Sequence, residues 1–280
     1  MPETQRAPVY VEREPRAELA PLVTKLWFLD VPTRGPIEWI LPIPRVHAIV
    51  NLGEPYAVLR SGDTELGMTL EAGFVAGLQR TYLVNRNPER LRHVGAELRP
   101  YAFASLGMEP FAAEVRPASR ALPALDGVRA ALAPDAAPDE CLAALEDALV
   151  AALAASGAIA DPTVARVADE IDRRPDARVA DVAAASGVSA GSLAQRFRRA
   201  TGTTPKVYAD TVRFHRFLTR LAEPGPLPTW TELIADTSYY DQPHFIRAFT
   251  RFAGLSPREY LRILGEEGRV EPSFLYPDGE

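Results

Sequence analysis

The sequence predicts an α+β protein of two domains, with a β-rich first third and an all-α last third. Short segments rich in β-branched and aromatic residues, separated by Gly, Pro, Asn and Asp, lie between residues 37 and 98. From residue 139 onward, apolar residues instead recur at steps of three and four, which is the period of an amphipathic helix. A chain of 280 residues is long enough for two domains of ordinary size.

The predicted strands cover 37–43, 46–52, 56–60, 73–79 and 92–98. Residues 46–52 alternate between an apolar face and a mixed face, as expected for a strand with one side in a core. Several short strands at this spacing favour a small barrel or sandwich. We expect this β-rich domain to occupy residues 1–120.

A helix is predicted from Asp139 to Ser156, within a helical linker that we place at 121–160. A stripe of leucines lies along one side of this helix. The stripe has two uses that the sequence leaves open, namely packing on the β-domain or pairing with a second copy in a homodimer. Its members are Leu142, Leu145, Leu149 and Leu153.

The last third reads as a series of short helices with clear start signals. Asp161-Pro162 provides an N-cap oxygen followed by a proline at the first helical position, and Thr204-Pro205 and Ser256-Pro257 repeat the device. The predicted helices are 162–173, 179–186, 190–200, 205–222, 230–237, 242–252 and 257–264. We expect a compact all-α domain at 161–265, followed by an acidic tail at 266–280.

These helices contain an internal duplication. Residues 187–197 resemble residues 238–249, and each copy leads through a Thr-Gly or Ala-Gly turn to a proline at a helix start. Leu193 and Phe197 correspond to Phe245 and Phe249, so the two copies fit two helix-turn-helix units. The helix 205–222 between them is about 27 Å long, which would place the two second helices roughly one DNA turn apart.

The charge distribution agrees with a nucleic-acid partner. The formal net charge is -6, yet residues 190–221 carry seven Arg or Lys against the single acid Asp210. Such a basic stripe in an acidic protein indicates a face that meets phosphate, although a solvated helix face would give the same count.

Arg and Gln suit bidentate contact with guanine and adenine edges, and other cations suit phosphate. The candidate base-reading residues are Gln195, Gln242, Ile246 and Arg247. The candidate phosphate contacts are Arg198, Arg199, Lys206, Arg213, Arg251 and Arg258.

Residues 161–264, and above all Tyr240 to Tyr260, resemble the DNA-binding domain of the AraC/XylS family of bacterial transcription regulators. The β-rich part, with Val50-Asn-Leu-Gly53 and Phe74-Val-Ala-Gly77, is similar to the cupin-like effector domain of some members. The resemblance implies double-stranded promoter DNA as the partner and an N-terminal domain that senses a small-molecule effector or dimerises. RNA polymerase is a further partner if the protein is an activator.

Two departures from the family pattern lie in the second unit, where Ser238 replaces the usual turn glycine and Ile234 a small alanine. The first recognition helix offers Gly191, Ala194 and Gln195 at the base-reading positions. We therefore expect the first unit to contact mainly phosphates and the second to carry most of the direct base readout.

Other functions find little support. The histidines at 47, 93, 215 and 244 are isolated from each other in sequence, and the one cysteine, Cys141, excludes an internal disulfide, so we expect no metal and no cofactor. No catalytic motif emerges. The alternatives are a cupin-like metal enzyme with an accessory helical domain and a protein-interaction module that no longer binds DNA. No membrane span or export signal is visible, which predicts a cytoplasmic protein.

Overall fold

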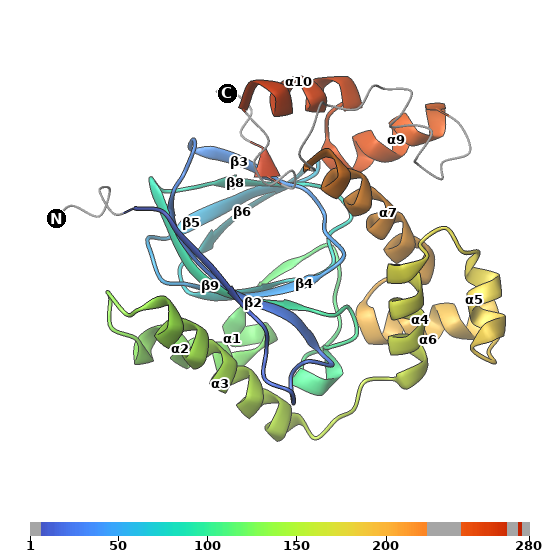
Figure 1. The fold of residues 1–280 in the computed structure, drawn as a ribbon, viewed down its shortest axis with the longest axis horizontal. Coiled ribbons are helices and arrows are strands. Elements are labelled where there is room, and N and C mark those ends of the chain that lie inside the picture. The colour runs from blue at the N-terminus through green and yellow to red at the C-terminus, as the bar shows by residue number, and fades with distance from the viewer. Residues whose placement is uncertain (1–6, 223–241, 268–273, 276–280) are drawn as a thin grey trace.

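The computed structural model describes residues 7–222, 242–267 and 274–275. Two facing sheets form a β-sandwich, helices α1–α3 lie below it in the view of Figure 1, and the remaining helices run along its other sides. The predicted α+β class, a β-sheet domain followed by a helical domain, is confirmed.

The described strands pair into two sheets, in the orders β1-β2-β9-β4-β7-β10 and β11-β3-β8-β5-β6. They are β1 (Val9–Arg13), β2 (Val23–Pro32), β3 (Ile37–Ile40), β4 (Val46–Asn51), β5 (Tyr56–Ser61), β6 (Thr64–Leu70), β7 (Gly73–Ala76), β8 (Leu83–Arg86), β9 (Arg90–Leu98), β10 (Val115–Pro117) and β11 (Phe274–Leu275).

The two faces of the first sheet pack against different partners. Phe74 and Val115 lie in a buried cluster with Tyr56 and Val58 of the second sheet, so this cluster fills the space between the sheets. Leucines of α3 (Pro138–Ser156) cover the opposite face of the first sheet, over β2 and β9. Both faces of this sheet are therefore buried over much of its area.

Five predicted strands are present, at β3, β4, β5, β7 and β9. The prediction missed β2, although it is ten residues long, because several consecutive residues such as Leu26, Trp27 and Phe28 are all buried. A strand buried on both faces has no polar alternation for a pattern search to find. β11 also could not be predicted, since it is a two-residue segment of the acidic tail that pairs with Trp39 and Ile40 of β3.

The helical elements follow the predicted order. They are the 3₁₀ turns η2 (Ala104–Leu106) and η3 (Pro123–Leu125) and the helices α1 (Ala118–Ala121), α2 (Asp126–Ala131), α3, α4 (Pro162–Arg173), α5 (Val179–Ala185), α6 (Ala190–Thr201), α7 (Pro205–Ala222), α9 (Gln242–Ala253) and α10 (Pro257–Glu267). The predicted helix 230–237 lies outside the described residues, as do Ile234 and Ser238.

The leucine stripe of α3 packs on the β-domain. Leu142, Leu145 and Leu149 are fully buried in the cluster that contains the first sheet, and Leu153 is partly buried against it. The buried surface of these leucines is used by β2 and β9. Of the two uses that the sequence left open, the structure shows packing on the β-domain, and pairing with a second copy stays a prediction.

The structure reproduces the internal repeat. α6 and α9 begin and end 52 positions apart, and α7 and α10 both start at a proline. Gly202 and Gly254 end the two helices with φ of 73° and 71°, a conformation that glycine adopts without strain. We refer to α4–α6 as the first unit and to α9–α10 as the second unit, with α7 between them.

Candidate nucleic-acid interface

The first recognition helix, α6, has one buried face and one open face. Ser189 caps it by accepting a hydrogen bond from the Ser192 amide at 3.2 Å. Leu193 and Phe197 are fully buried. On the opposite side, a shallow hollow is lined by Gly191, Ala194, Gln195, Arg198 and Arg199. The structure thus gathers on one surface the small residues, the predicted base reader and two of the predicted phosphate contacts.

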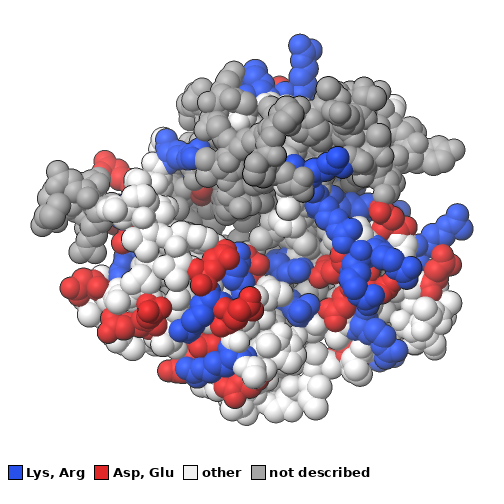
Figure 2. Space-filling model, in the orientation of Figure 1, with Lys and Arg blue, Asp and Glu red and all other residues white. Residues whose placement is uncertain are grey.

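Exposed cations lie in this part of the first unit and at the start of α7. Arg198, Arg199 and Lys206 are exposed. In Figure 2, Lys and Arg gather over the α4–α7 part of the molecule, with acidic residues among them. Some of these acidic residues are partners of the remaining arginines of the basic stripe, several of which bind acceptors within the protein.

Three arginines of the stripe have structural partners. Arg196 binds the Asp161 carboxylate through two hydrogen bonds of 2.8 Å, and Arg216 donates to the carbonyl of Arg173 at 3.0 Å. Arg213 binds the Asp210 carboxylate and donates to the Pro175 carbonyl at 3.0 Å.

The prediction that Arg213 contacts phosphate is therefore not supported, because its guanidinium is engaged inside the helical domain. A count of charges could not reveal this. Pro175 is 38 positions away in sequence, and only folding brings it to Arg213.

The second recognition helix, α9, is anchored by aromatic packing. Phe245, Phe249 and Phe252 are nearly fully buried, as the repeat predicted. Phe249 and Phe252 meet Phe214 of α7, with ring centroids 5.5 Å and 4.7 Å apart. α7 therefore contributes directly to the core of the second unit.

The structure describes the side chains of only some of the residues of α9 that are predicted to read bases. Arg247 is exposed, whereas Ile246 is half-buried against the aromatic cluster and only partly faces solvent. The side chains of Gln242 and His244 lie outside the described residues. Arg251 and Arg258, predicted to contact phosphate, are exposed, and the Arg251 guanidinium lies 4.8 Å from the centre of the Phe252 ring.

A hollow lies between part of this helix and the β-sandwich. Ile246, Arg247, Thr250 and Arg251 line one side of it, and the β5–β6 turn (Ser61–Thr64) with Thr81 and Tyr82 lines the other. The reading side of α9 thus borders the β-sandwich, whereas no described β-strand residue lines the hollow on α6.

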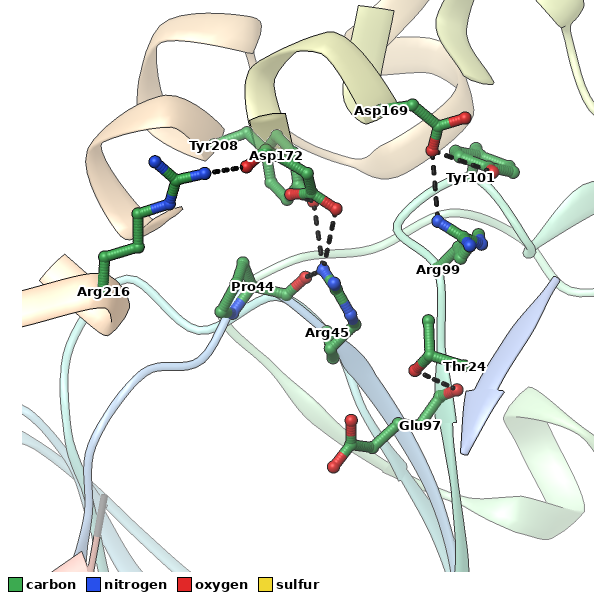
Figure 3. Close-up of polar contacts among 10 residues, drawn as sticks. All are labelled: Thr24, Pro44, Arg45, Glu97, Arg99, Tyr101, Asp169, Asp172, Tyr208 and Arg216. Carbon is green, nitrogen blue, oxygen red and sulfur yellow. Dashed lines mark hydrogen bonds and ion pairs between the residues drawn. The ribbon is translucent and has the colours of Figure 1, made fainter. Parts of the chain in front are cut away.

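Charged residues join the β-sandwich to the first unit. In Figure 3, Arg45 lies against Asp172 and Tyr208, at 3.2 Å from the carboxylate and 3.3 Å from the hydroxyl. Tyr208 is 1% exposed and donates to Asp172 at 2.6 Å. Burial, and then the Asp172 charge, raises the pKa of Tyr208 well above its usual value. The tyrosine therefore acts as a neutral hydrogen-bond donor.

A second contact of the same kind lies beside it, where Arg99 binds Asp169 at 3.1 Å and the Tyr101 hydroxyl approaches the same carboxylate at 3.4 Å. Sequence reasoning missed both contacts. Each joins a strand or its end to α4 over some seventy positions or more, and no local motif marks such a pairing.

Two half-buried histidines, each with one buried ring nitrogen, lie near the same junction. Neither His47 Nε2 nor His215 Nδ1 has a hydrogen-bond partner in the described part of the chain. Burial lowers the pKa of both, and burial together with the Arg45 charge lowers that of His215 to about 4. Across the described residues, no group of three or more His, Cys, Asp or Glu side chains could hold a metal ion. No described helix is long and apolar enough to cross a bilayer.

Comparison with known families agrees with this geometry. Residues 182–263 match the family model described as a helix-turn-helix domain, and residues 11–114 match one described as a domain of unknown function, DUF6597. No curated protein matches the chain.

Several solved structures are similar. One is ToxT from Vibrio cholerae O395 bound to (E)-4-(8-methylnaphthalen-1-yl)but-3-enoic acid, at 8% identity and a TM-score of 0.49, covering 90% of this chain and 98% of that one. Unsaturated-fatty-acid-bound ToxT from strain SCE256 has 10% identity and a TM-score of 0.46, over 92% and 97% of the two chains. The C-terminal domain of AraT, a response regulator from Geobacillus stearothermophilus, has 25% identity and a TM-score of 0.33, over 36% of this chain and 85% of that domain.

The matched helix-turn-helix model covers α6, α7, α9 and most of α10, and thus both predicted recognition helices and the helix between them. Both recognition helices have a buried apolar face, exposed arginines and a left-handed glycine at the C-terminal end. The chain therefore carries an AraC-type helix-turn-helix domain and is a DNA-binding transcription regulator.

Proposed function

We propose that the two helix-turn-helix units dock in successive major grooves on one face of a DNA duplex, and that the β-domain regulates this docking. The repeat of α6 and α9 carries the proposal, because both helices bury an equivalent apolar face and keep exposed arginines. α7 has 18 residues, so it is about 27 Å long and suits a separation near one turn of DNA.

Individual roles follow from exposure. Gln195 and Arg247 are exposed and would read base edges, together with Gln242 and in part Ile246. The phosphate contacts would come from Arg198, Arg199, Lys206, Arg251 and Arg258. We leave Arg213 out of this set, since Asp210 and Pro175 hold its guanidinium.

The β-domain at 1–120 would act as the regulatory domain and 161–265 as the DNA-binding domain, with 121–160 joining them. Support comes from the direct contact between the parts, since Arg45 and Arg99 of the β-domain bind acids of α4. A small-molecule effector that alters the β-domain would therefore act on the first unit directly. A second copy of this chain would be the partner in a homodimer, and RNA polymerase would be a partner of an activator.

The same proposal assigns the chain no enzymatic activity and a place in the cytoplasm, where bacterial DNA is found. Catalytic roles for the histidines at 47 and 215 receive no support, because burial holds both in the neutral form away from any described metal-binding group.

Selection from a pool of random DNA duplexes tests the proposal. The full-length protein should enrich a sequence with two half-sites. Arg247→Ala should relax preference at one position of one half-site by roughly ten- to a hundredfold, as expected for loss of a bidentate base contact. Gln195→Ala should act on the other half-site.

Lys206→Ala provides the contrast, since loss of a phosphate contact should weaken all sequences alike and reduce the salt slope by about one. Arg120→Ala, an exposed arginine of α1, is the matched control and should change neither property. A wild-type protein that enriches no sequence, or an Arg247→Ala variant that loses affinity uniformly, would contradict the proposed function.

A further inference from the structure

The two units of the repeat meet the β-domain at the same structural position. Gly202 and Gly254 are 52 positions apart, and each ends a recognition helix with a left-handed residue. The two amides make equivalent hydrogen bonds, to Arg198 at 2.9 Å and to Thr250 at 2.8 Å. Each of these two turns lies directly against the β-domain.

The turn of the first unit packs on the backbone of the β-domain. A Cβ atom added at Gly202 would lie 2.6 Å from the carbonyl carbon of Phe111, so only glycine fits there. Arg80 reaches the same turn from the β7–β8 loop (residues 77–82). Its guanidinium lies 3.5 Å from the Gly202 carbonyl and 3.4 Å from the Thr203 hydroxyl.

The next two residues of the loop reach the turn of the second unit. The Tyr82 ring covers Gly254 so closely that an added Cβ atom would lie 2.2 Å from Cε1 of the ring. The Thr81 hydroxyl donates to the Arg251 carbonyl at 3.0 Å, two residues before the end of α9. Three consecutive residues, Arg80 to Tyr82, therefore touch both units.

The loop is held rigidly on the sandwich. Tyr82 stacks on Trp39, with ring centroids 4.6 Å apart and planes 11° apart, and its carbonyl accepts from Gly62 at 2.8 Å. Leu78 forms a bridge with Ala112 and accepts from the Ala113 amide at 2.8 Å. The surface against Gly202 and the loop against Gly254 are thus parts of one braced structure.

We propose that the β7–β8 loop fixes the relative placement of the two recognition helices, and that Arg80, Thr81 and Tyr82 thereby determine which half-site spacing the protein accepts. The proposal rests on the proposed function, since it assumes that both helices bind one duplex. α7 sets the distance between the units along its own axis. The loop adds contacts on both sides of α7, and these oppose rotation of one unit relative to the other.

Half-site spacing is sensitive to such rotation. Each inserted base pair turns the second half-site by about 34° around the duplex, given 10.5 base pairs per turn. If the relative orientation of the two units is fixed, both can bind only when the second half-site has one particular rotation around the duplex. We call this fixed orientation the clamp. If the clamp is removed, the second unit can rotate to meet a displaced half-site.

The test uses the duplex that the wild-type protein selects from random DNA, remade with one to five base pairs inserted or removed between the half-sites. Arg80→Gln with Thr81→Val removes the polar contacts, and Tyr82→Leu, added to these, removes the stacked ring while keeping an apolar side chain. Arg120→Gln with Thr69→Val, two exposed positions of the β-domain away from the loop, is the matched control.

Wild type and control should lose at least tenfold in affinity when the spacing changes by two base pairs. The triple variant should lose less than about threefold, and its affinity for a duplex with a single half-site should equal that of wild type. The double variant should be intermediate. Equal thermal unfolding midpoints would exclude a general loss of fold.

A measurement without DNA provides a second check. Spin labels on Ala184→Cys in α5 and Arg258→Cys in α10 report the distance between the units, while the native Cys141 is buried. The distance distribution should be narrow in the wild-type background and broad in the triple variant.

A folded triple variant with the wild-type spacing profile and a narrow distance distribution would overturn the inference and leave α7 as the sole determinant of spacing. That result leaves the proposed function intact. A wild-type protein without sequence preference would overturn the proposed function and this inference with it.

Discussion

The two units of the repeat are attached to the β-domain in different ways. The first unit shares one continuous apolar cluster with the first sheet and α3, and ion pairs of Arg45 and Arg99 reinforce the junction. The second unit has its own cluster, in which phenylalanines pack against Tyr82, Val84 and Leu41 of the sandwich. The two copies of the repeat share a local sequence pattern, but this pattern does not determine how each unit packs on the β-domain.

The difference has a physical consequence. Ion pairs respond to salt and pH, and half-buried histidines respond to pH, whereas aromatic packing hardly responds to either. The first junction is therefore sensitive to the ionic environment, and the second depends mainly on the volume and shape of its side chains. Substitutions at equivalent positions of the repeat can separate these contributions.

The largest expected effects come from the buried phenylalanines. Phe249→Ala should lower the free energy of unfolding of the second unit by about 3–5 kcal/mol, because the ring contacts Phe217, Phe245 and Tyr260 and leaves a cavity. Phe197→Ala, at the equivalent position, should destabilise the β-domain as well, since its cluster is continuous with the first sheet.

Hydrogen exchange resolved by segment checks this contrast. Phe249→Ala should accelerate exchange in α9 and α10 and leave β9 protected, whereas Phe197→Ala should accelerate exchange in β9 too. Loss of protection in β9 caused by Phe249→Ala would show that the two clusters unfold as one.

Acid should loosen the first junction before the second. Burial lowers the pKa of His215 to about 4, below the unfolded value near 6.5, so the unfolded chain binds the proton more readily. This histidine therefore destabilises the fold as pH falls from 6.5 toward 4, by about 2 kcal/mol at pH 5.

Charged and titratable groups of the β-domain also set the pKa of His215. Arg45, Lys25 and His47 lower the pKa of His215, and Glu97 raises it. The free energy of unfolding, measured by urea titration at pH 7 and pH 5, should fall less in His215→Gln than in wild type. An unchanged difference between the two pH values would show that other groups dominate the acid response.

The sequence predicted the repeat and the elements that follow a simple period, but not the contacts that join them. Leu193, Phe197, Phe245 and Phe249 stand at helical spacing, so their burial could be predicted and is confirmed. β2 was not predicted because both of its faces are buried, so its sequence lacks the alternation of apolar and polar residues.

The roles of charged residues were harder to predict, since a partner distant in sequence decides them. Arg213 and Arg198 look alike in the basic stripe, yet Asp210 and Pro175 engage only the former. Arg80 lies in a loop with no motif, and its contacts to Gly202 and Thr203 exist only because the whole domain packs there. Long-range pairing of this kind leaves no local periodic signal.

Tyr208→Phe should have a moderate effect confined to the first junction. The hydroxyl donates to Asp172 at 2.6 Å in a nearly dry environment, and its loss leaves the carboxylate with Arg45 as a neighbour. We expect a cost of about 1–2 kcal/mol in the free energy of unfolding. Tyr101→Phe is the matched variant, and its longer 3.4 Å contact to Asp169 should cost less. Equal costs would argue against a special role for the Arg45 junction.

The smallest expected effects concern the caps of α7 and α10, which occupy equivalent positions of the repeat. Ser256 and Glu259 form a reciprocal capping box, in which the Ser256 hydroxyl accepts from the Glu259 amide at 3.3 Å and the Glu259 carboxylate accepts from the Ser256 amide at 2.9 Å. At α7, the Thr204 hydroxyl accepts from the Val207 amide at 3.3 Å, but valine returns no acceptor.

Ser256→Ala should therefore cost about 1 kcal/mol and Thr204→Ala somewhat less. The Ser256 hydroxyl accepts from the Glu259 amide and also donates to the Glu259 carboxylate at 2.6 Å, so its removal breaks two hydrogen bonds, whereas removal of the Thr204 hydroxyl breaks one capping bond. The Ser256 hydroxyl and amide also lower the pKa of Glu259, so the extra cost at Ser256 should vanish as pH falls far enough to protonate this carboxyl group. Thermal unfolding of wild type and both variants at pH 7 and pH 3 measures the difference in cost between the two substitutions at each pH. A cost at Ser256 that stays the same at both pH values would assign the difference between the caps to packing rather than to the carboxylate.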